Sequence, residues 1–497
     1  MTPQVDISKL SFGAPAAERD INQGLIHYFV ESDTFAQLVK RTKTLILGNR
    51  GAGKSALFKV FADRERKKGS LVLELAPENY SYEILSQQMA KEAEGAWRKQ
   101  GAYAAAWKYL IYVLVMKEIT SSGPKLKSGS AAVVYNYLRD TFKGEQTNPI
   151  GLLISYLKRM EGIKIGPYEA SVKTKQLTGL YHLEEINDLI PAINELSEKR
   201  AVAVMIDELD RGWDASEDAK AFVAGLVQAA LSINDKHKNL CIFVSLRREL
   251  YDSIPSLYED AQKYRDVMET VRWDEESLLS LAAKRIRHTA PETTNLPDRD
   301  CWNSVFAETL QYRKSNSFNY IVDRTLYRPR EIIQFCTATL DETRNTRSLP
   351  PIDYHVISHC EVTYSTERTK DIAAEYRFQY PGLQSIFEAF RGKGYSWSRK
   401  ELDTLFLQMS LGEIKLDKLA TWAAGQEPEF FMDILWRVGF LRALAVGGVK
   451  ALRRSGSQHL GPHQIDTLSL HNIERFTVHQ MFRAGLGMKE IKEARDD

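Results

Sequence analysis

The chain has 497 residues, a length that suggests about three domains of ordinary size. Hydrophobic residues make up 43% of it and charged residues 27%, which is typical of a globular protein with a sizeable core. The formal net charge of +2 excludes a general electrostatic attraction to nucleic acid or to a membrane, so any such binding must come from a local patch.

The cysteines and the amino terminus indicate the cell compartment. Cys241, Cys301, Cys336 and Cys360 are scattered, without a C-x-x-C pair or metal-ligand spacing, so we expect reduced and mostly buried thiols. The first residues lack both the charged and the apolar part of a signal peptide. We therefore expect a cytoplasmic protein.

A leader of residues 1–43 precedes the first predicted strand, and its pattern suggests short helices at 19–30 and 35–40. Residues 44–62 then form a strand, a glycine-rich loop and a helix in register. The loop matches the P-loop pattern G-x-x-x-x-G-K-[ST] without a gap. A glycine-rich turn with an incidental Lys-Ser is the alternative, and the flanking strand and helix argue against it.

The P-loop pattern carries a defined chemistry. Glycines let the backbone bend around phosphates, and a helix amino terminus favours negative charge. Lys54 is expected to contact the β- and γ-phosphates, and the Ser55 hydroxyl to bind Mg²⁺. The predicted ligands are therefore ATP and Mg²⁺. The predicted nucleotide-binding residues are Gly48, Asn49, Arg50, Gly51, Ala52, Gly53, Lys54, Ser55 and Ala56.

A second strand is predicted at 70–75, but the next buried strand comes only at 201–206. One crossover needs about 30 residues, so we expect an insertion at about 80–199. Its predicted helices are 82–99, 102–120, 131–142, 149–160 and 183–199. The apolar run 102–116 is 15 residues long and contains Lys108, whereas a membrane span needs about 20 apolar residues. A buried helix is the better interpretation, and no membrane contact is expected.

Acidic residues follow the strand 201–206. Asp207-Glu208-Leu209-Asp210 lies where a parallel sheet presents its ligands, at the carboxyl end of a strand. Asp207 is expected to hold Mg²⁺, and Glu208 to orient and deprotonate the attacking water. The alternative is an acidic, solvated turn. Because a complete P-loop precedes the motif, we favour the Walker B interpretation.

Two further segments provide candidate phosphate sensors. The buried strand 239–248 ends in Ser245, Arg247 and Arg248, on the same edge as the acids. Arg330 lies in the first turn of a helix beginning at Arg328, where the helix dipole disfavours a cation. An anion must therefore lie nearby, either ATP phosphate or a carboxylate.

The carboxyl-terminal third is predicted to begin after a boundary near 347–351. Expected elements are helices at 352–364, 384–390, 397–407 and 430–439, then strands at 440–441, 445–452 and 466–470, with 476–483 closing the module. Ser398 is expected to cap the third helix, and Gly439 to end the fourth. Helices followed by a two-stranded hairpin suggest a winged-helix module.

The loop 455–463 and its flanks would make the wing basic, through Lys450, Arg453, Arg454, His459 and His463. DNA contact is one interpretation, and a solvated or protein-binding wing is the slightly favoured alternative. Arg454 and His459 also match the R-x-x-x-x-H spacing of some ribonucleases, which we attribute to chance in a glycine- and serine-rich loop.

Together the P-loop, the segment 207–210, Ser245–Arg248 and Arg328–Arg330 resemble AAA+ ATPases of the STAND and origin-recognition-initiator branch, over about residues 1–345. The leader 12–20, the Trp273-Asp274 pair and the carboxyl end resemble a group of bacterial P-loop ATPases associated with anti-phage defence. The resemblance implies that Ser245 is sensor 1 and Arg330 is sensor 2, reporting the γ-phosphate through a helical lid. The long insertion resembles KAP-type ATPases but lacks membrane spans. No unmistakable arginine finger stands out; the candidates are Arg247, Arg248 and Arg265.

The predicted fold class is α/β, a P-loop NTPase with a parallel sheet, an inserted helical subdomain, a helical lid and a winged-helix module. The predicted domains are 1–43, 44–290, 291–350 and 351–497. The predicted catalytic residues are Glu208, Lys54, Arg330 and Ser245, and the predicted metal ligands are Ser55 and Asp207. We expect an ATP-hydrolysing switch that controls an effector or an assembly, with self-association or a protein partner. A DNA-binding ATPase of the initiator or loader type is the alternative, and a small-molecule kinase is a third reading.

Overall fold

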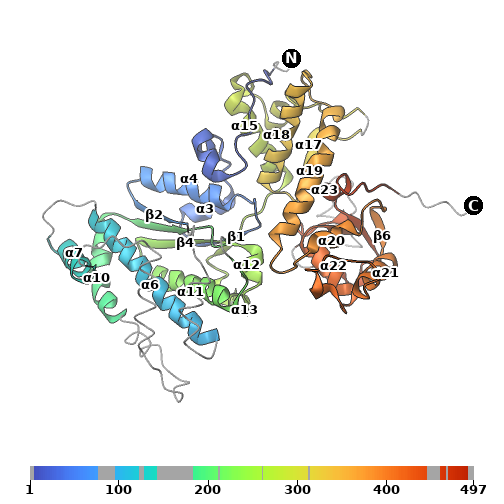
Figure 1. The fold of residues 1–497 in the computed structure, drawn as a ribbon. Helices are drawn as coiled ribbons and strands as arrows, with labels where there is room; N and C mark the ends of the chain where they lie inside the picture. Colours follow the sequence, from blue (N-terminus) through green and yellow to red (C-terminus); the bar gives the residue numbers. More distant parts are fainter. Residues whose placement is uncertain are drawn as a thin grey trace, which may run out of the picture. The chain divides into compact units, whose positions relative to one another are not determined.

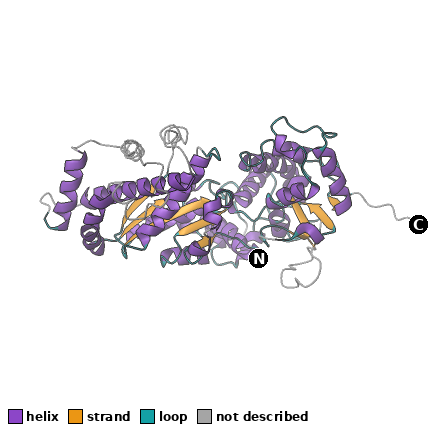
Figure 2. Cartoon of the chain, turned by 90° about the horizontal axis from the view of Figure 1, so that it is seen from below, coloured by secondary structure: helices purple, strands orange, loops and turns teal. Residues whose placement is uncertain are grey.

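The computed structural model describes residues 5–76, 96–121, 128–142, 183–210, 213–259, 261–311, 314–444, 459–465 and 468–490 (Figure 1). The chain divides into two compact units. We call Glu31–Asn49 with Lys54–Val271 the core unit, and Met1–Val30, Arg50–Gly53 and Arg272–Asp497 the helical unit. Figure 2 shows strands in two separate sheets, one in each unit. The predicted helix 149–160 and most of 82–99 lie outside the described residues.

The core unit contains a parallel sheet of five strands with the order β2-β3-β4-β1-β5. The strands are β1 (Leu45–Gly48), β2 (Leu71–Leu75), β3 (Val202–Ile206), β4 (Leu240–Arg247) and β5 (Met268–Thr270). The four predicted strands are confirmed. We did not predict β5, because Met268-Glu269-Thr270 contains no apolar run and pairs along only one edge, with β1.

Alternating side chains of β4 serve the two faces of this sheet. Ile242 and Val244 belong to the larger buried core, which α6 (Ala96–Ser121) and α11 (Glu217–Asn234) cover. On the other face the ring of Phe243 lies 5.0 Å from that of Phe61 in α4 (Lys54–Lys67). Figure 1 shows α4 and α6 with α11 on opposite sides of the strands. The remaining helices of the unit are α3 (Asp33–Val39), α7 (Ser130–Phe142), α10 (Leu183–Lys199), α12 (Arg248–Asp252), α13 (Pro255–Glu259) and α14 (Ala261–Tyr264).

The first part of the helical unit packs the leader against five helices. Phe12 and Leu10 are buried in one core with residues of α15, α18 and the first half of α19. The elements are α1 (Ala17–Asp20), α2 (Leu25–Tyr28), α15 (Glu275–Thr289), α16 (Asp298–Asn303), α17 (Ser317–Val322), α18 (Pro329–Asn345) and α19 (Tyr354–Glu375). Asp274 and Ser277 cap α15 reciprocally, which explains why the helix begins at Glu275.

The carboxyl-terminal part has its own core and a four-stranded antiparallel sheet with the order β6-β9-β7-β8. Its elements are α20 (Leu383–Glu388), β6 (Ser396–Ser398), α21 (Arg399–Ser410), α22 (Pro428–Arg437), β7 (Leu441–Leu444), β8 (His459–Leu460), β9 (Arg475–Val478) and α23 (Gln480–Arg483). The Ser398 cap is confirmed, with Glu401 completing a capping box, and Gly439 follows α22 in a left-handed conformation, φ 81°.

One predicted strand of this part was wrong. Residues 466–470 form no strand in their described positions, and Leu470–Asn472 is a short 3₁₀ helix. The partners of β7 are instead β8 and β9. Both strands are too short to show a recognisable alternation of apolar and polar residues. They are strands because they pair with β7. The predicted strand 445–452 lies outside the described residues.

Two expectations about composition are met by the described residues. All four cysteines are free and buried, and burial raises the pKa of the Cys241 thiol to about 12. None of the helices that the structure describes is long and apolar enough to cross a bilayer, α6 included.

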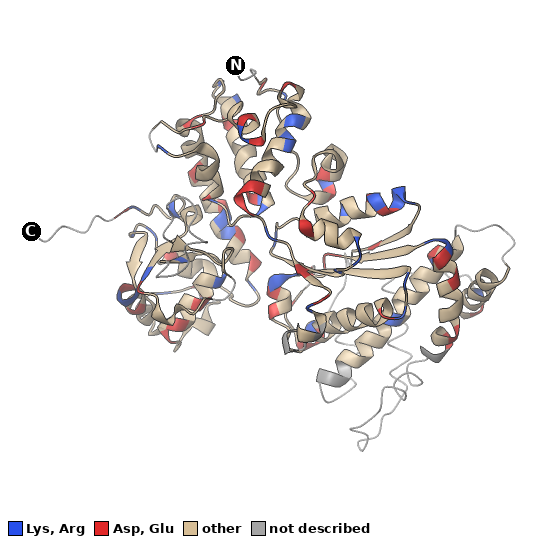
Figure 3. Ribbon diagram, turned by 180° about the vertical axis from the view of Figure 1, so that it is seen from behind, with Lys and Arg blue, Asp and Glu red and all other residues tan. Residues whose placement is uncertain are grey.

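Basic side chains in the last turn of α4, coloured blue in Figure 3, suit the negative end of its helix dipole.

Two glycines of the core unit provide a matched test of helix packing. A Cβ at Gly225 of α11 would lie 2.8 Å from the backbone nitrogen of Ala104 and from Cβ of Tyr103, whereas a Cβ at Gly101 of α6 would meet nothing within 4 Å. We expect Gly225→Ala to lower the free energy of unfolding by about 1–3 kcal/mol. Gly101→Ala should raise it by about 0.5–1 kcal/mol. Denaturant unfolding of both variants measures the difference, and equal effects would contradict the packing.

Candidate functional site

The loop between β1 and α4 has the backbone that its glycines predict. Gly51 and Gly53 adopt φ angles of 80° and 96°, in the left-handed region where side chains are strained. A Cβ at Gly51 would also lie 3.0 Å from Cβ of Arg330, closer than nearly all real contacts. Glycine at position 51 therefore serves both the turn and the close approach of α18.

Lys54, the first residue of α4, is buried rather than projecting into solvent. Its Nζ donates hydrogen bonds to the carbonyls of Gly48 at 2.7 Å and Asn49 at 3.2 Å. Burial lowers the pKa of Lys54, while the carboxylates of Glu249 and Asp207 oppose that shift. The ammonium thus lies in a pocket of carbonyls and carboxylates at the end of β1, where a phosphate could replace the carbonyls as its partner.

Asp207 and Ser245 lie on the face of the sheet that α4 covers. Side chains alternate along a strand, so Ser245 shares the face of Phe243, and Asp207 follows β3 on the same face. Ser245 pairs in register with Ile46 of β1. It is only 2% exposed, and its hydroxyl has no hydrogen-bond partner among the residues that the structure describes. A buried hydroxyl of this kind is free to bond a ligand at the strand end.

Glu208 directly follows Asp207 and has a φ of 61°, which is unusual for a residue with a side chain. Such strain costs about 1–3 kcal/mol and persists where the surroundings impose it. The backbone N–H of Asp207 is held by the carbonyl of Leu75 in β2, so the turn begins from a fixed point.

The two arginines at the end of β4 form ion pairs with nearby carboxylates. Arg247 forms ion pairs with Asp210 and, at 3.7 Å, with Glu249, and Arg248 bonds Asp252 at 2.9 Å. Glu249 is 8% exposed and contributes to the electrostatics of Lys54, yet we did not predict it. A glutamate at a helix start has no distinguishing sequence signal, and only the fold places it beside β1.

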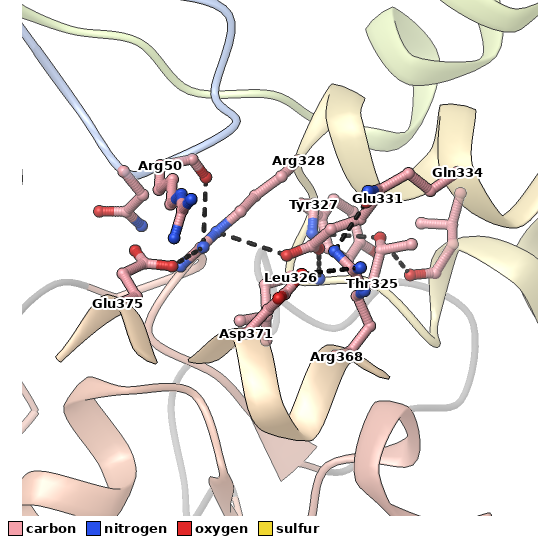
Figure 4. Close-up of polar contacts among 12 residues, drawn as sticks. Arg50, Thr325, Leu326, Tyr327, Arg328, Glu331, Gln334, Arg368, Asp371 and Glu375 are labelled. Carbon is pink, nitrogen blue, oxygen red and sulfur yellow. Dashed lines mark hydrogen bonds and ion pairs between the residues drawn. The ribbon is translucent and has the colours of Figure 1, made fainter. Parts of the chain in front are cut away.

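Three residues of the helical unit donate hydrogen bonds to loop residues 50–52, which belong to the same unit. The backbone N–H of Arg330 bonds the carbonyl of Gly51 at 3.4 Å, and its Nε donates to the carbonyl of Pro15 at 3.2 Å. The indole of Trp273 donates to the carbonyl of Ala52 at 2.8 Å. Arg328, which we did not single out, donates to the carbonyl of Arg50 at 3.2 Å (Figure 4).

The described residues of the predicted basic wing are not basic. Burial and the nearby Arg442 lower the pKa of His459 to about 4 and that of His463 to about 3, so both are neutral at pH 7. The ring of His463 stacks on Tyr327 with centroids 4.2 Å apart. Lys450, Arg453 and Arg454 lie outside the described residues. The prediction was wrong for the two histidines because packing, not composition, sets their charge.

A family model and a curated relative each match part of this chain. Residues 276–373, from α15 into α19, match the family model described as the FunZ-associated C-terminal helical domain. The chain is 27% identical over 394 residues to an Escherichia coli K12 protein named "Putative transposon gamma-delta 80.3 kDa protein". That match covers 76% of this chain and 53% of the relative, so the chain spans about half the length of the curated relative it matches.

Among solved structures, the chain is similar to the Aeropyrum pernix ORC2 protein, determined in ADPNP–ADP complexes. The identity is 10%, and the match covers 94% of this chain and 92% of that protein. The TM-score is 0.37. A similarity at that level supports no conclusion about this chain.

Ser245 allows a test of whether its hydroxyl belongs to a ligand. Removing a buried hydroxyl without a partner should leave the free energy of unfolding unchanged or raise it by about 1 kcal/mol. We therefore expect Ser245→Ala to be no less stable than the parent in denaturant unfolding. The control is Ser70, also buried in the core unit, whose hydroxyl donates to Glu65 at 3.0 Å. Ser70→Ala should lose about 1 kcal/mol. A comparable loss in Ser245→Ala would show that its hydroxyl is already satisfied.

Proposed function

We propose that the chain binds ATP and hydrolyses it, using the P-loop and the acidic strand end of the core unit. One observation carries the proposal: the buried ammonium of Lys54 lies in the field of Asp207 and Glu249, on the sheet face where Ser245 keeps a hydroxyl without a partner. A cation, acids and an unsatisfied hydroxyl at the carboxyl ends of adjacent parallel strands suit a phosphate ligand.

The ground-state contacts follow from the residues themselves. Lys54 would exchange its two carbonyl partners for phosphate oxygens, and the amide groups of residues 49–56 at the start of α4 would bind the remaining charge. Ser55, half-buried in the first turn of α4, and Asp207 would hold Mg²⁺, which neutralises phosphate charge when bound. A hydroxyl and a carboxylate are the oxygen ligands that this ion prefers.

Hydrolysis needs a base and an attacking water. We assign the base to Glu208, which would accept a proton from water as the water oxygen attacks the γ-phosphorus and ADP leaves. Ser245 would donate its hydroxyl to the phosphate. Asp210 is a weaker candidate for the base, because Arg247 already binds it.

The carboxyl-terminal part fits a winged-helix module in the order of its elements. In this proposal α21 and α22 form the helical pair, and β7, β8 and β9 form the sheet around the wing. ATP binding and hydrolysis would change the lid at 291–350 and this module, 351–497, and so control a protein effector or an assembly. A role in anti-phage defence stays a prediction from the sequence resemblance.

A DNA-binding ATPase is the second candidate, and α22 argues against it. The exposed side of this helix carries Glu429, Asp433 and Arg437, and Arg399 forms an ion pair with Glu429. Phe430 is 37% exposed on the same helix. A face without an excess of cations offers little attraction to phosphate, and an exposed aromatic side chain suits a protein partner. Figure 3 shows both signs of charge interspersed along most helices.

The hydrolysis step is tested by Glu208→Gln. An amide cannot take the water proton, so we expect unchanged ATP binding with turnover reduced by about 10²–10⁴-fold. Lys54→Ala is the matched control, which should lose ATP binding and also some stability, because two carbonyls lose their donor. Nucleotide titration and phosphate release measure the two steps. Parental turnover in Glu208→Gln would refute its assignment as the base.

The DNA alternative is tested by salt dependence. A protein that neutralises Z phosphates shows a slope of about −0.9Z for log affinity against log salt. Because the exposed side of α22 has no excess of cations and both described wing histidines are neutral, we expect a slope near zero with labelled duplex between 50 and 200 mM salt, conditions in which real phosphate contacts are resolved. A steep slope that Asp433→Lys makes steeper would favour the DNA-binding candidate instead.

A further inference from the structure

Three successive carbonyls of the P-loop are bound by the helical unit. The carbonyl of Arg50 accepts from Arg328, that of Gly51 from the backbone N–H of Arg330, and that of Ala52 from the indole of Trp273. A trans peptide directs its C=O and its N–H in opposite directions. Each amide N–H of residues 51, 52 and 53 therefore points away from the donor that binds the preceding carbonyl. Successive N–H groups clear of such donors are the elements of an anion nest.

Of the three donors, only Arg328 is a buried charge. It is 5% exposed, and its guanidinium also bonds Glu375 at 2.8 Å and lies 3.7 Å from Glu331 (Figure 4). Burial alone would lower the pKa of Arg328, but the two carboxylates more than offset it and raise that pKa. One side chain thus joins a carbonyl of the loop to the last residue of α19.

The residues before Arg328 are held by the carboxyl-terminal core. Leu326 fills the space beside Gly439, where a Cβ would lie 2.8 Å from its Cδ2. Tyr327 has a φ of 56° and stacks on His463. The carboxylate of Glu331 accepts the N–H of Leu326 at 2.6 Å. Residues 326–328 consequently form a short connection whose two ends contact the P-loop and the core around β7 and α22.

We propose that Arg328 is a positioning residue for nucleotide binding. Its guanidinium holds the Arg50 carbonyl outward so that the loop amides face the phosphates, and its pair with Glu375 transmits the loop conformation to the carboxyl end of α19. The inference rests on the proposed binding of ATP. It assigns a role to Arg328 that differs from the phosphate-sensing role predicted for Arg330.

The test removes the loop contact together with the carboxylate that lies nearest to Arg328. Arg328→Met alone would leave the buried carboxylate of Glu375 without its cation. The test variant therefore carries both Arg328→Met and Glu375→Gln, and the single variant Glu375→Gln is its reference. We expect the double variant to bind ATP about 10-fold more weakly, the usual effect of losing a hydrogen bond from a charged group. KM for ATP should rise by that factor with kcat within about threefold, since the base is untouched.

Two further variants keep the result interpretable. Arg368 belongs to the same polar cluster, bonds Gln334 and Asp371, and has no recorded contact with the loop, so Arg368→Met should bind ATP like the parent. Arg328→Lys keeps the charge beside Glu375 but cannot reproduce the forked contacts, and we expect a folded protein with an intermediate loss. Hydrogen exchange at residues 372–375 should slow on ATP addition in the parent and not in the double variant.

The outcomes separate this inference from the proposed function. If the parent binds no ATP in titration, the proposed function fails. If the parent binds ATP and the double variant matches Glu375→Gln, Arg328 does not position the loop. If affinity falls equally in Arg368→Met, the effect comes from general loosening of the cluster and the inference is overturned. Exchange at 372–375 that slows equally in both proteins removes the link to α19.

Discussion

Hydrogen bonds to the loop carbonyls are the constraint on which the rest of the candidate site depends. Five consecutive carbonyls, from Gly48 to Ala52, each accept a donor of the chain. Lys54 provides the first two within the core unit, and the helical unit provides the other three. A carbonyl bound in this way does not face a phosphate, and its peptide presents its N–H on the opposite side. Gly51 and Gly53 adopt positive φ angles within this segment, which glycine tolerates because it has no Cβ.

Buried charge explains why arginine stands at position 328. Two carboxylates, Glu331 and Glu375, are 4% and 7% exposed, and a buried carboxylate is costly unless it is paired. The planar guanidinium has five donors in a fixed fork, so one side chain can pair Glu375 and still reach the Arg50 carbonyl. Glu375 is the closer partner of the cation, at 2.8 Å against 3.7 Å for Glu331, and burial raises the pKa of Glu331 against the opposing effect of Arg328.

The sequence predicts the parts of this protein that repeat a pattern and misses those that depend on pairing. Four of the five strands in the parallel sheet have apolar runs, and the P-loop has a spaced motif, so both were found in advance. By contrast, β5 and β8 are short strands that exist because β1 and β7 pair with them. Arg328 and Glu249 carry no local signal, since burial beside another element gives each its role. The charge of His459 and His463 likewise depends on burial and on the nearby Arg442, which no local sequence pattern reveals.

Strain in the backbone distinguishes the residues that the fold constrains most. Six described residues other than glycine have positive φ angles, and Glu208 and Tyr327 are two of them. Each follows a fixed point: the Asp207 N–H is bound to Leu75, and the Tyr327 N–H donates to Thr325 Oγ1 at 3.2 Å while its ring stacks on His463. A left-handed conformation persists only where neighbours over-determine it. At Tyr327 those neighbours are Thr325 and His463, and they hold the residue that precedes Arg328. At Glu208 the turn places a carboxylate directly after Asp207 at the end of β3, which is where the proposed hydrolysis requires a base.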